Sequence, residues 1–386
     1  MPVPLLDVNA QNHPLEPELT AAFTRVLRTG RFILGDEVEA FEAECAAFIG
    51  AAHAVSMSSG TDALLAAFMA LGIGPGDEVL CPAFTFFASA GSIYRTGATP
   101  VFCDVCPVTF NLDLKSAAAR LTPQTKAMVP VHLFGQAAEM DAIRAFAAAH
   151  KLLIIEDVAQ SIGATYQDSG CGTLGDIGCF SFFPSKNLGG FGDGGLVTTQ
   201  DADLAEKLRR IRNHGMHPRY YHASVGANFR MDALQCALLR VKLRHLGAYA
   251  SGRAANAKYY IEHLSKLPGV RQAGAADGST APRIVLPLAG PNKGHVWNQF
   301  TLRVPGPGRR DALKSHLMAR GIGCEIYYPV ALHQQACFKQ LPAHAIQPCP
   351  VSESLTHEVL SIPVYPELRS VQLDEVISAI AEWDVI

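Results

Sequence analysis

The segment SFFPSKNLGGFGDGG, residues 181–195, places a single lysine between phenylalanines and a glycine-rich run. Apolar neighbours lower the pKa of a lysine by desolvation, so Lys186 could act as a neutral, nucleophilic amine. A phosphate-binding lysine and a solvated loop lysine are the alternatives. The phosphate-loop motif G-x-x-x-x-G-K-[ST] is absent, because the glycines follow Lys186. A solvated lysine explains neither the phenylalanines nor the acid at position 157, so the segment favours a Schiff-base lysine.

Asp157 ends the apolar run LLIIEDV at residues 152–158. A carboxylate at the end of a buried strand costs free energy unless a positive group meets it. That group is either a lysine or arginine of the protein, which is the commoner outcome, or a protonated ring nitrogen of a ligand. Gln160, three residues later, should face the same cleft.

The segment SSGTDAL, residues 58–64, lies between a strand pattern and a helical pattern. Unpaired amide N–H groups and the positive end of the helix favour an anion there. Gly60 allows close backbone approach and Thr61 adds a hydroxyl. An ordinary helix N-cap fits the same residues.

Together these three features match one cofactor. An anion site, a carboxylate and an amine are what the phosphate, the ring nitrogen and the aldehyde of pyridoxal phosphate require. In mainly parallel sheets, ligands bind beyond the carboxyl ends of the strands, and each feature follows a strand pattern. The sequence therefore predicts pyridoxal phosphate as the cofactor, with Lys186 and Asp157 as catalytic residues.

The elements that would position these groups alternate from about residue 35. Near-continuous apolar runs between amphipathic helices indicate an α/β fold with a mainly parallel sheet between layers of helices. The expected strands lie within residues 53–57, 74–82, 99–105, 125–135, 152–158 and 176–183. The expected helices lie at residues 37–50, 61–72 and 140–151, with long helical stretches at 201–215 and 231–267.

A small α+β domain is expected after the composition shifts near residue 270 to a segment rich in Gly, Ala and Pro. Strand patterns at residues 296–304 and 323–329 flank a helical pattern at 309–321. The length of the chain favours two domains. We predict a large cofactor-binding domain at 1–250 and a small domain at 251–386.

Composition excludes several classes of partner. The formal net charge is −3 and no long run of Lys or Arg occurs, which argues against a nucleic-acid partner. Cys103 and Cys106 have C-x-x-C spacing without a second pair or a nearby histidine, so no metal site is expected. The N-terminus has no signal-peptide pattern, and no uncharged run approaches the roughly 20 residues of a membrane span. We expect a soluble, cytoplasmic protein that acts on a small molecule.

The sequence resembles the nucleotide-sugar aminotransferases of the DegT/DnrJ/EryC1/StrS family, which have the aspartate-aminotransferase fold (fold type I). The resemblance covers nearly the whole chain. It is carried, in order, by RFILGDEVEAFE, SSGTDAL, GPGDEV, FTFFAS, PVHLFG, IEDVAQSIGA, SFFPSKNLGGFGDGG, NHG, ANFRMDALQCALL and YYPVALH. It implies a pyridoxal-phosphate-dependent aminotransferase of amino-sugar biosynthesis, for a surface polysaccharide such as lipopolysaccharide or for a secondary metabolite.

Within this family, SFFPSKNLG followed by GDGG is similar to the branch that aminates C3 of UDP- or dTDP-linked 3-oxo sugars. A C4-specific aminotransferase and a non-catalytic regulatory homologue are the alternatives. The sugar dehydratases of the family replace the lysine with histidine, and this chain keeps Lys186. Some relatives that act on uronic acids carry histidine where this chain has Tyr327, which argues against a carboxylated sugar.

The resemblance also implies roles for single residues around the cofactor. Lys186 would form the covalent link, Asp157 would hold the pyridinium nitrogen and Gln160 would lie near the ring hydroxyl. Phe86 would stack on the ring.

The remaining roles concern the phosphate, the second subunit and the substrate. The phosphate would be bound by Gly60, Thr61 and Ser181. Asn228 would reach the cofactor phosphate of the neighbouring subunit, which implies an obligate homodimer with shared active sites. The residues expected near the keto nucleotide sugar are Arg230, Tyr327 and Tyr328. L-Glutamate is the expected amino donor. Trp297 and His333 are expected in the core or at its rim.

Overall fold

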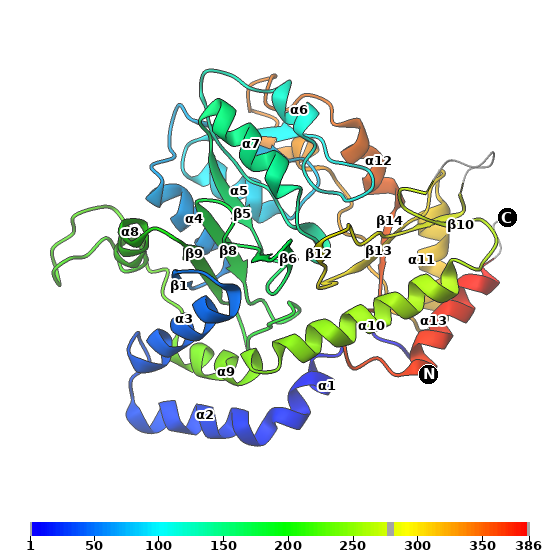
Figure 1. The fold of residues 1–386 in the computed structure, drawn as a ribbon, viewed down its shortest axis with the longest axis horizontal. Helices are drawn as coiled ribbons and strands as arrows, with labels where there is room; N and C mark the ends of the chain where they lie inside the picture. The colour runs from blue at the N-terminus through cyan, green and yellow to red at the C-terminus, as the bar shows by residue number, and fades with distance from the viewer. Residues whose placement is uncertain (1, 276–281, 384–386) are drawn as a thin grey trace.

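The computed structural model describes residues 2–275 and 282–383. A seven-stranded sheet with helices packed on both faces forms the larger part, and a four-stranded sheet with its own helices forms the smaller part (Figure 1). The fold confirms the expected α/β architecture with a small C-terminal α+β unit. Within the described residues, no helix combines the length and the apolarity that crossing a membrane requires.

The large sheet has the strand order β1-β9-β8-β5-β4-β2-β3. These strands are His53–Met57, Gly195–Thr199, Ile177–Ser181, Leu153–Asp157, Thr125–Met128, Glu78–Pro82 and Thr99–Cys103. Every pairing is parallel except the two that β9 makes with β1 and β8. The sheet is therefore mainly parallel, as predicted, and the carboxyl ends of β1, β5 and β8 lie at one edge.

Two apolar layers sandwich this sheet because alternate residues of each strand point to opposite faces. In β9, Val197 packs with α4 (Gly60–Ala70) on one face. Its neighbour Leu196 packs on the other face with α3 (Asp36–Ile49) and α9 (Ala233–Leu243). Further helices are α1 (Val8–Asn12), α2 (Glu16–Thr29), α5 (Phe87–Arg95), α6 (Leu114–Ala118), α7 (Met140–His150) and α8 (Ala202–Arg212).

The small unit has the sheet order β10-β11-β13-β14. Its strands are Val270–Gln272, Ile284–Leu286, Phe300–Arg303 and Val359–Ile362, and its helices are α10 (Leu246–Leu264), α11 (Arg309–Ala319), α12 (Pro350–Glu358) and α13 (Ser370–Glu382). The proposed boundary at residue 250 falls inside α10, which carries the chain from the large sheet to the small one (Figure 1). Trp297 is buried in this core, as predicted.

Three sequence-based strand predictions need correction. The segment 323–329 forms no strand and pairs only through an isolated bridge from Glu325 to Ser361, because its tyrosines pack against the large unit instead. The strand expected at 296–304 covers only Phe300–Arg303. The strand expected at 125–135 ends at Met128, two residues before Pro130, which has no N–H for a ladder.

Two further differences concern helices and short strands. The helical stretch expected at 231–267 is divided into α9 and α10. Between residues 272 and 296 the described part includes β11 and β12 (Lys293–Gly294), which pairs with β6 (Thr165–Tyr166); β7 is Ser169–Gly170. Residues 276–281 of that segment lie outside the described residues.

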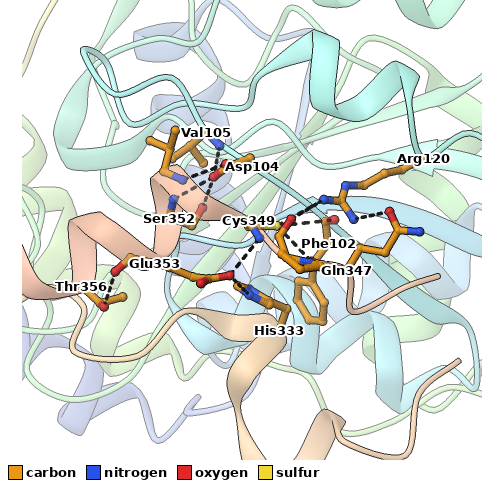
Figure 2. Close-up of polar contacts among 12 residues, drawn as sticks. Phe102, Asp104, Val105, Arg120, His333, Gln347, Cys349, Ser352, Glu353 and Thr356 are labelled. Atoms are coloured by element: carbon orange, nitrogen blue, oxygen red, sulfur yellow. Dashed lines mark hydrogen bonds and ion pairs between the residues drawn. The ribbon is translucent and has the colours of Figure 1, made fainter. Parts of the chain in front are cut away.

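Asp104 attaches α12 to the large sheet directly after β3 (Figure 2). Its Oδ1 accepts hydrogen bonds from the backbone N–H groups of Val105 (3.0 Å) and Ser352 (2.7 Å) and from the Ser352 hydroxyl (2.7 Å), and its Oδ2 accepts from the N–H of Val351 (2.9 Å). The carboxylate thus satisfies N–H groups that the first turn of α12 leaves without intrahelical partners.

Candidate active site

The N-terminus of α4 lies against the end of β8. A Cβ atom at Gly60 would stand 2.6 Å from the Cβ of Ser181, so only glycine permits this approach. Ser59 caps the helix by accepting the N–H of Asp62 at 3.0 Å. The N–H groups of Gly60 and Thr61 have no acceptor among the described residues. An anion could therefore accept from these N–H donors, which lie among the predicted phosphate residues Gly60, Thr61 and Ser181.

Asp157 lies at the carboxyl end of β5 and is 5% exposed. Its Oδ2 accepts a hydrogen bond from the Ser89 hydroxyl at 2.7 Å, and its Oδ1 accepts from the N–H of Ala159 at 3.1 Å. Within the described part of the chain, the side-chain hydrogen bonds of Asp157 come from Ser89 and Ala159, and no ion pair joins it to lysine or arginine. Of the two partners considered for this carboxylate, a protonated ligand nitrogen is the one that the site still admits.

Lys186 follows β8 in a turn closed by its backbone N–H, which donates to the carbonyl of Phe183 at 2.8 Å. Burial lowers the pKa of its amine to about 8, and the negative charge of Asp157 opposes this shift. Lys242 is also buried and its pKa is lowered to about 8, but its amine donates to the carbonyl of Gly189 at 2.6 Å. No such partner of the Lys186 amine occurs among the described residues, so this amine is the available nucleophile.

Gln160 and the aromatic residues form the wall of the cleft. Gln160 accepts from the N–H of Phe134 at 2.7 Å and donates to the hydroxyl of Tyr328 at 3.0 Å. Burial raises the pKa of Tyr328, so its hydroxyl keeps its proton. The ring of Phe86 lies 6.2 Å from that of Tyr328 and is 57% exposed, so one of its faces is available for stacking. Tyr327 packs against Tyr328 at 5.9 Å.

Asn228 and Arg230 belong to the segment between α8 and α9, part of which loops away from the body of the molecule (Figure 1). Asn228 is exposed and bridges Asn213, and Arg230 donates to the side chain of Asn213 at 2.6 Å. Phe229 links this segment to the phosphate region, because its carbonyl accepts the N–H of Ser58 at 2.7 Å. The roles expected for Asn228 and Arg230 stay predictions.

The site also contains polar residues that sequence analysis did not find. Ser89 contacts Asp157 directly, and its signal was its place in the FTFFAS motif. His132 and Glu156 form a fully buried pair at 2.8 Å. His132 Nδ1 accepts the N–H of Ala138, so its proton is on Nε2 and is donated to Glu156. No pattern marked this pair, because His132 lies in the loop after β4 and Glu156 lies in β5.

These residues fit pyridoxal phosphate. Free N–H donors at Gly60 and Thr61 suit the phosphate, and acceptor capacity left on Asp157 suits a protonated ring nitrogen. Lys186 would supply the amine for a covalent link. When bound, the cofactor supplies an electron sink that stabilises negative charge on the carbon undergoing proton transfer. Lys186, with its lowered pKa, could accept and return that proton.

The model of the DegT/DnrJ/EryC1/StrS aminotransferase family matches residues 14–381. The chain belongs to this family. It is a pyridoxal-phosphate-dependent sugar aminotransferase of fold type I. Similar proteins include an Acidithiobacillus ferrooxidans UDP-N-acetyl-3-dehydro-alpha-D-glucosamine 3-aminotransferase, 45% identical over 98% of this chain and 97% of that protein. A Geobacillus stearothermophilus pleiotropic regulatory protein is 44% identical over 99% of both chains.

The fold agrees with a solved relative. The crystal structure of S. venezuelae DesV in complex with a ketimine intermediate superimposes with a TM-score of 0.91 and 43% identity, covering 99% of this chain and 98% of that one. The predicted family, fold and cofactor are thereby confirmed.

Proposed function

We propose that this aminotransferase transfers an amino group from L-glutamate to C3 of a UDP- or dTDP-linked 3-oxo sugar. The observation that carries the proposal is the 45% identity, over nearly the whole chain, to an enzyme named as a 3-aminotransferase of a UDP-linked 3-dehydro sugar. Lys186 and Asp157 are both present, as turnover requires.

The chain's own residues supply the steps of this reaction. Lys186 would move the proton at the donor carbon and later at the sugar carbon, because burial lowers the pKa of its amine to about 8 and so leaves a substantial neutral fraction near that pH. Asp157 would hold the ring nitrogen of the cofactor protonated. Tyr327, Tyr328 and Arg230 are proposed to contact the sugar; the raised pKa of Tyr328 keeps its hydroxyl able to donate a hydrogen bond.

The test separates the two halves of the reaction. Protein loaded with pyridoxal phosphate is mixed with L-glutamate, and the visible absorption band should bleach as 2-oxoglutarate forms. UDP- and dTDP-linked 3-oxo and 4-oxo sugars are then added singly. Recovery of the band with a 3-oxo sugar, and NMR evidence for nitrogen on C3, are expected. Recovery with 4-oxo sugars alone would replace the C3 assignment by the C4 alternative.

A regulatory role without turnover is the second candidate, because the G. stearothermophilus relative is named a regulatory protein. The available amine of Lys186 and the carboxylate of Asp157, which has no lysine or arginine partner among the described residues, favour turnover, since a protein without chemistry has no need of either. Absence of 2-oxoglutarate with every keto sugar, despite a visible cofactor band, would favour the regulatory role.

We further propose a homodimer in which Asn228 completes the partner's site. The segment that carries Asn228 also exposes Tyr220 and Val225, which are 74% and 84% exposed. Phe183, beside Lys186, is 53% exposed. A second copy would bury these apolar side chains. Sedimentation equilibrium should give twice the mass of one chain at micromolar concentration; a monomer that turns over would contradict the shared site.

A further inference from the structure

The FTFFAS motif at residues 84–89 contains polar residues to which the proposed chemistry gives no role. Thr85 is 2% exposed and Ser89 is fully buried. Ser89 lies in the first turn of α5, whereas Asp157 ends β5, 68 positions later in the chain. The helix that follows Phe86 is thus joined by a hydrogen bond to the strand that ends in the acid.

The direction of these hydrogen bonds is fixed by chemistry. The Ser89 hydroxyl lies 2.7 Å from Oδ2 of Asp157, and an ionised carboxylate only accepts, so Ser89 donates. The Thr85 hydroxyl lies 3.3 Å from the Ser89 oxygen. Because the single hydroxyl proton of Ser89 is donated to Asp157, Thr85 must be the donor in its hydrogen bond with Ser89. The result is a chain of two donors that ends on the carboxylate, and such chains polarise one another.

We propose that Ser89 is a positioning residue for Asp157: its hydroxyl, oriented by Thr85, holds the carboxylate in one rotamer opposite the cofactor ring. Ala159 N–H holds the other oxygen at 3.1 Å. With one donor on each oxygen, the carboxylate is fixed while acceptor capacity is left for a ligand. The inference concerns the cofactor alone and does not depend on which sugar is the substrate.

A matched control exists at the edge of the same sheet, where Asp104 follows β3. Ser352 is also fully buried, and its hydroxyl donates to Asp104 at the same distance of 2.7 Å (Figure 2). Ser89→Ala and Ser352→Ala therefore remove the same group from the same kind of partner. Their costs in unfolding free energy should be similar, and only the first change touches a carboxylate of the cleft.

The experiment titrates the visible absorption band of the loaded protein and measures the affinity of the cofactor-free protein for pyridoxal phosphate. Without Ser89, Asp157 should hold the ring nitrogen protonated less firmly, so less electron density is drawn from the link to Lys186. The apparent pKa at which the visible band changes with pH should then rise in Ser89→Ala. The affinity of the cofactor-free protein for pyridoxal phosphate should fall on the order of tenfold, as for a lost hydrogen bond to a charged group. Ser352→Ala should change neither.

Thr85→Val keeps the Ser89 hydroxyl and removes only the Thr85 hydroxyl that donates to it. This variant should shift the apparent pKa of the visible band in the same direction by a smaller amount. This variant carries the test if Ser89→Ala does not fold. An unchanged band and unchanged cofactor affinity in the folded variants, with a loss of unfolding free energy equal to that of Ser352→Ala, would show that Ser89 only stabilises the fold and would overturn the proposal.

Discussion

Asp104 and Asp157 are two buried carboxylates that follow parallel strands of the same sheet, yet they differ in what they bind. Asp104 accepts four hydrogen bonds, all from Val105 and the start of α12. Asp157 accepts two, and its negative charge acts on the pKa of the Lys186 amine. An acid at the end of a strand is therefore not a functional signal in itself. What distinguishes the carboxylate of the cleft is that Asp157 can still accept hydrogen bonds from a ligand after its contacts within the fold are made.

The largest expected effect comes from removing Lys186 near Asp157, and removal of Arg120 near Asp104 serves as the control. Lys186→Ala should lower kcat/KM by at least about 10⁴-fold, the upper range of general acid–base catalysis, because no other described amine is available there. Arg120→Gln is the control near Asp104, since Arg120 donates to the Pro348 carbonyl at 2.8 Å and has no part in the cleft (Figure 2). Steady-state kinetics of both variants test this; an active Lys186→Ala protein would refute the assignment.

The second prediction exchanges the two acids for asparagine. Asp157→Asn should lower kcat/KM on the order of 10²-fold, because the charge opposite the ring is lost. Its cost in unfolding free energy should be small, since the new amide can donate to the Ser89 oxygen once that hydroxyl turns. Asp104→Asn should show the reverse.

In Asp104→Asn the new NH2 group would face backbone N–H groups of α12. These N–H groups are fixed by the helix and cannot rotate to become acceptors. A loss of about 1–3 kcal/mol in unfolding free energy is expected, with kcat/KM retained in the folded fraction. Denaturant unfolding and kinetics on the same samples give both quantities. Equal stability losses in the two asparagine variants would remove the distinction between the carboxylates.

The positions of Asp157 and Lys186 in the fold were predictable, because Asp157 ends a recognisable strand, Lys186 follows another, and each residue type is rare at such a place. The contacts that distinguish Asp157 from Asp104 were not predictable. Ser89, Val351 and Ser352 approach these acids through folding of distant segments, and no local pattern encodes that. The same limit explains the strand wrongly expected at 323–329, where the local sequence suggested a strand but Tyr328 packs against Phe84 of the large unit.

The third prediction concerns pH. The pKa of Lys186 is about 8, below its ordinary value, because burial disfavours the charged amine. Below pH 8 the neutral fraction should fall tenfold per pH unit, and the rate at which cofactor-free protein forms its visible band should fall with it. Above pH 8 the rate should level off. Stopped-flow absorbance from pH 6 to 9.5 tests this, and a plateau only near pH 10.5 would mean that the amine is not desolvated.

The smallest expected effect comes from a test of whether the Asp157 site needs a residue from a second copy of the chain. The Asp104 contacts all come from one chain, whereas the Asp157 site is proposed to need Asn228 of a second copy. Lys186→Ala and Asn228→Ala proteins, each of low activity alone, are unfolded together and refolded at equal concentrations. Random pairing makes half of the dimers mixed, and one of the two sites in each mixed dimer is intact, so about a quarter of wild-type activity should return. If Asn228 serves its own chain, the mixture should give only the mean of the two parents, because no pairing would then create an intact site.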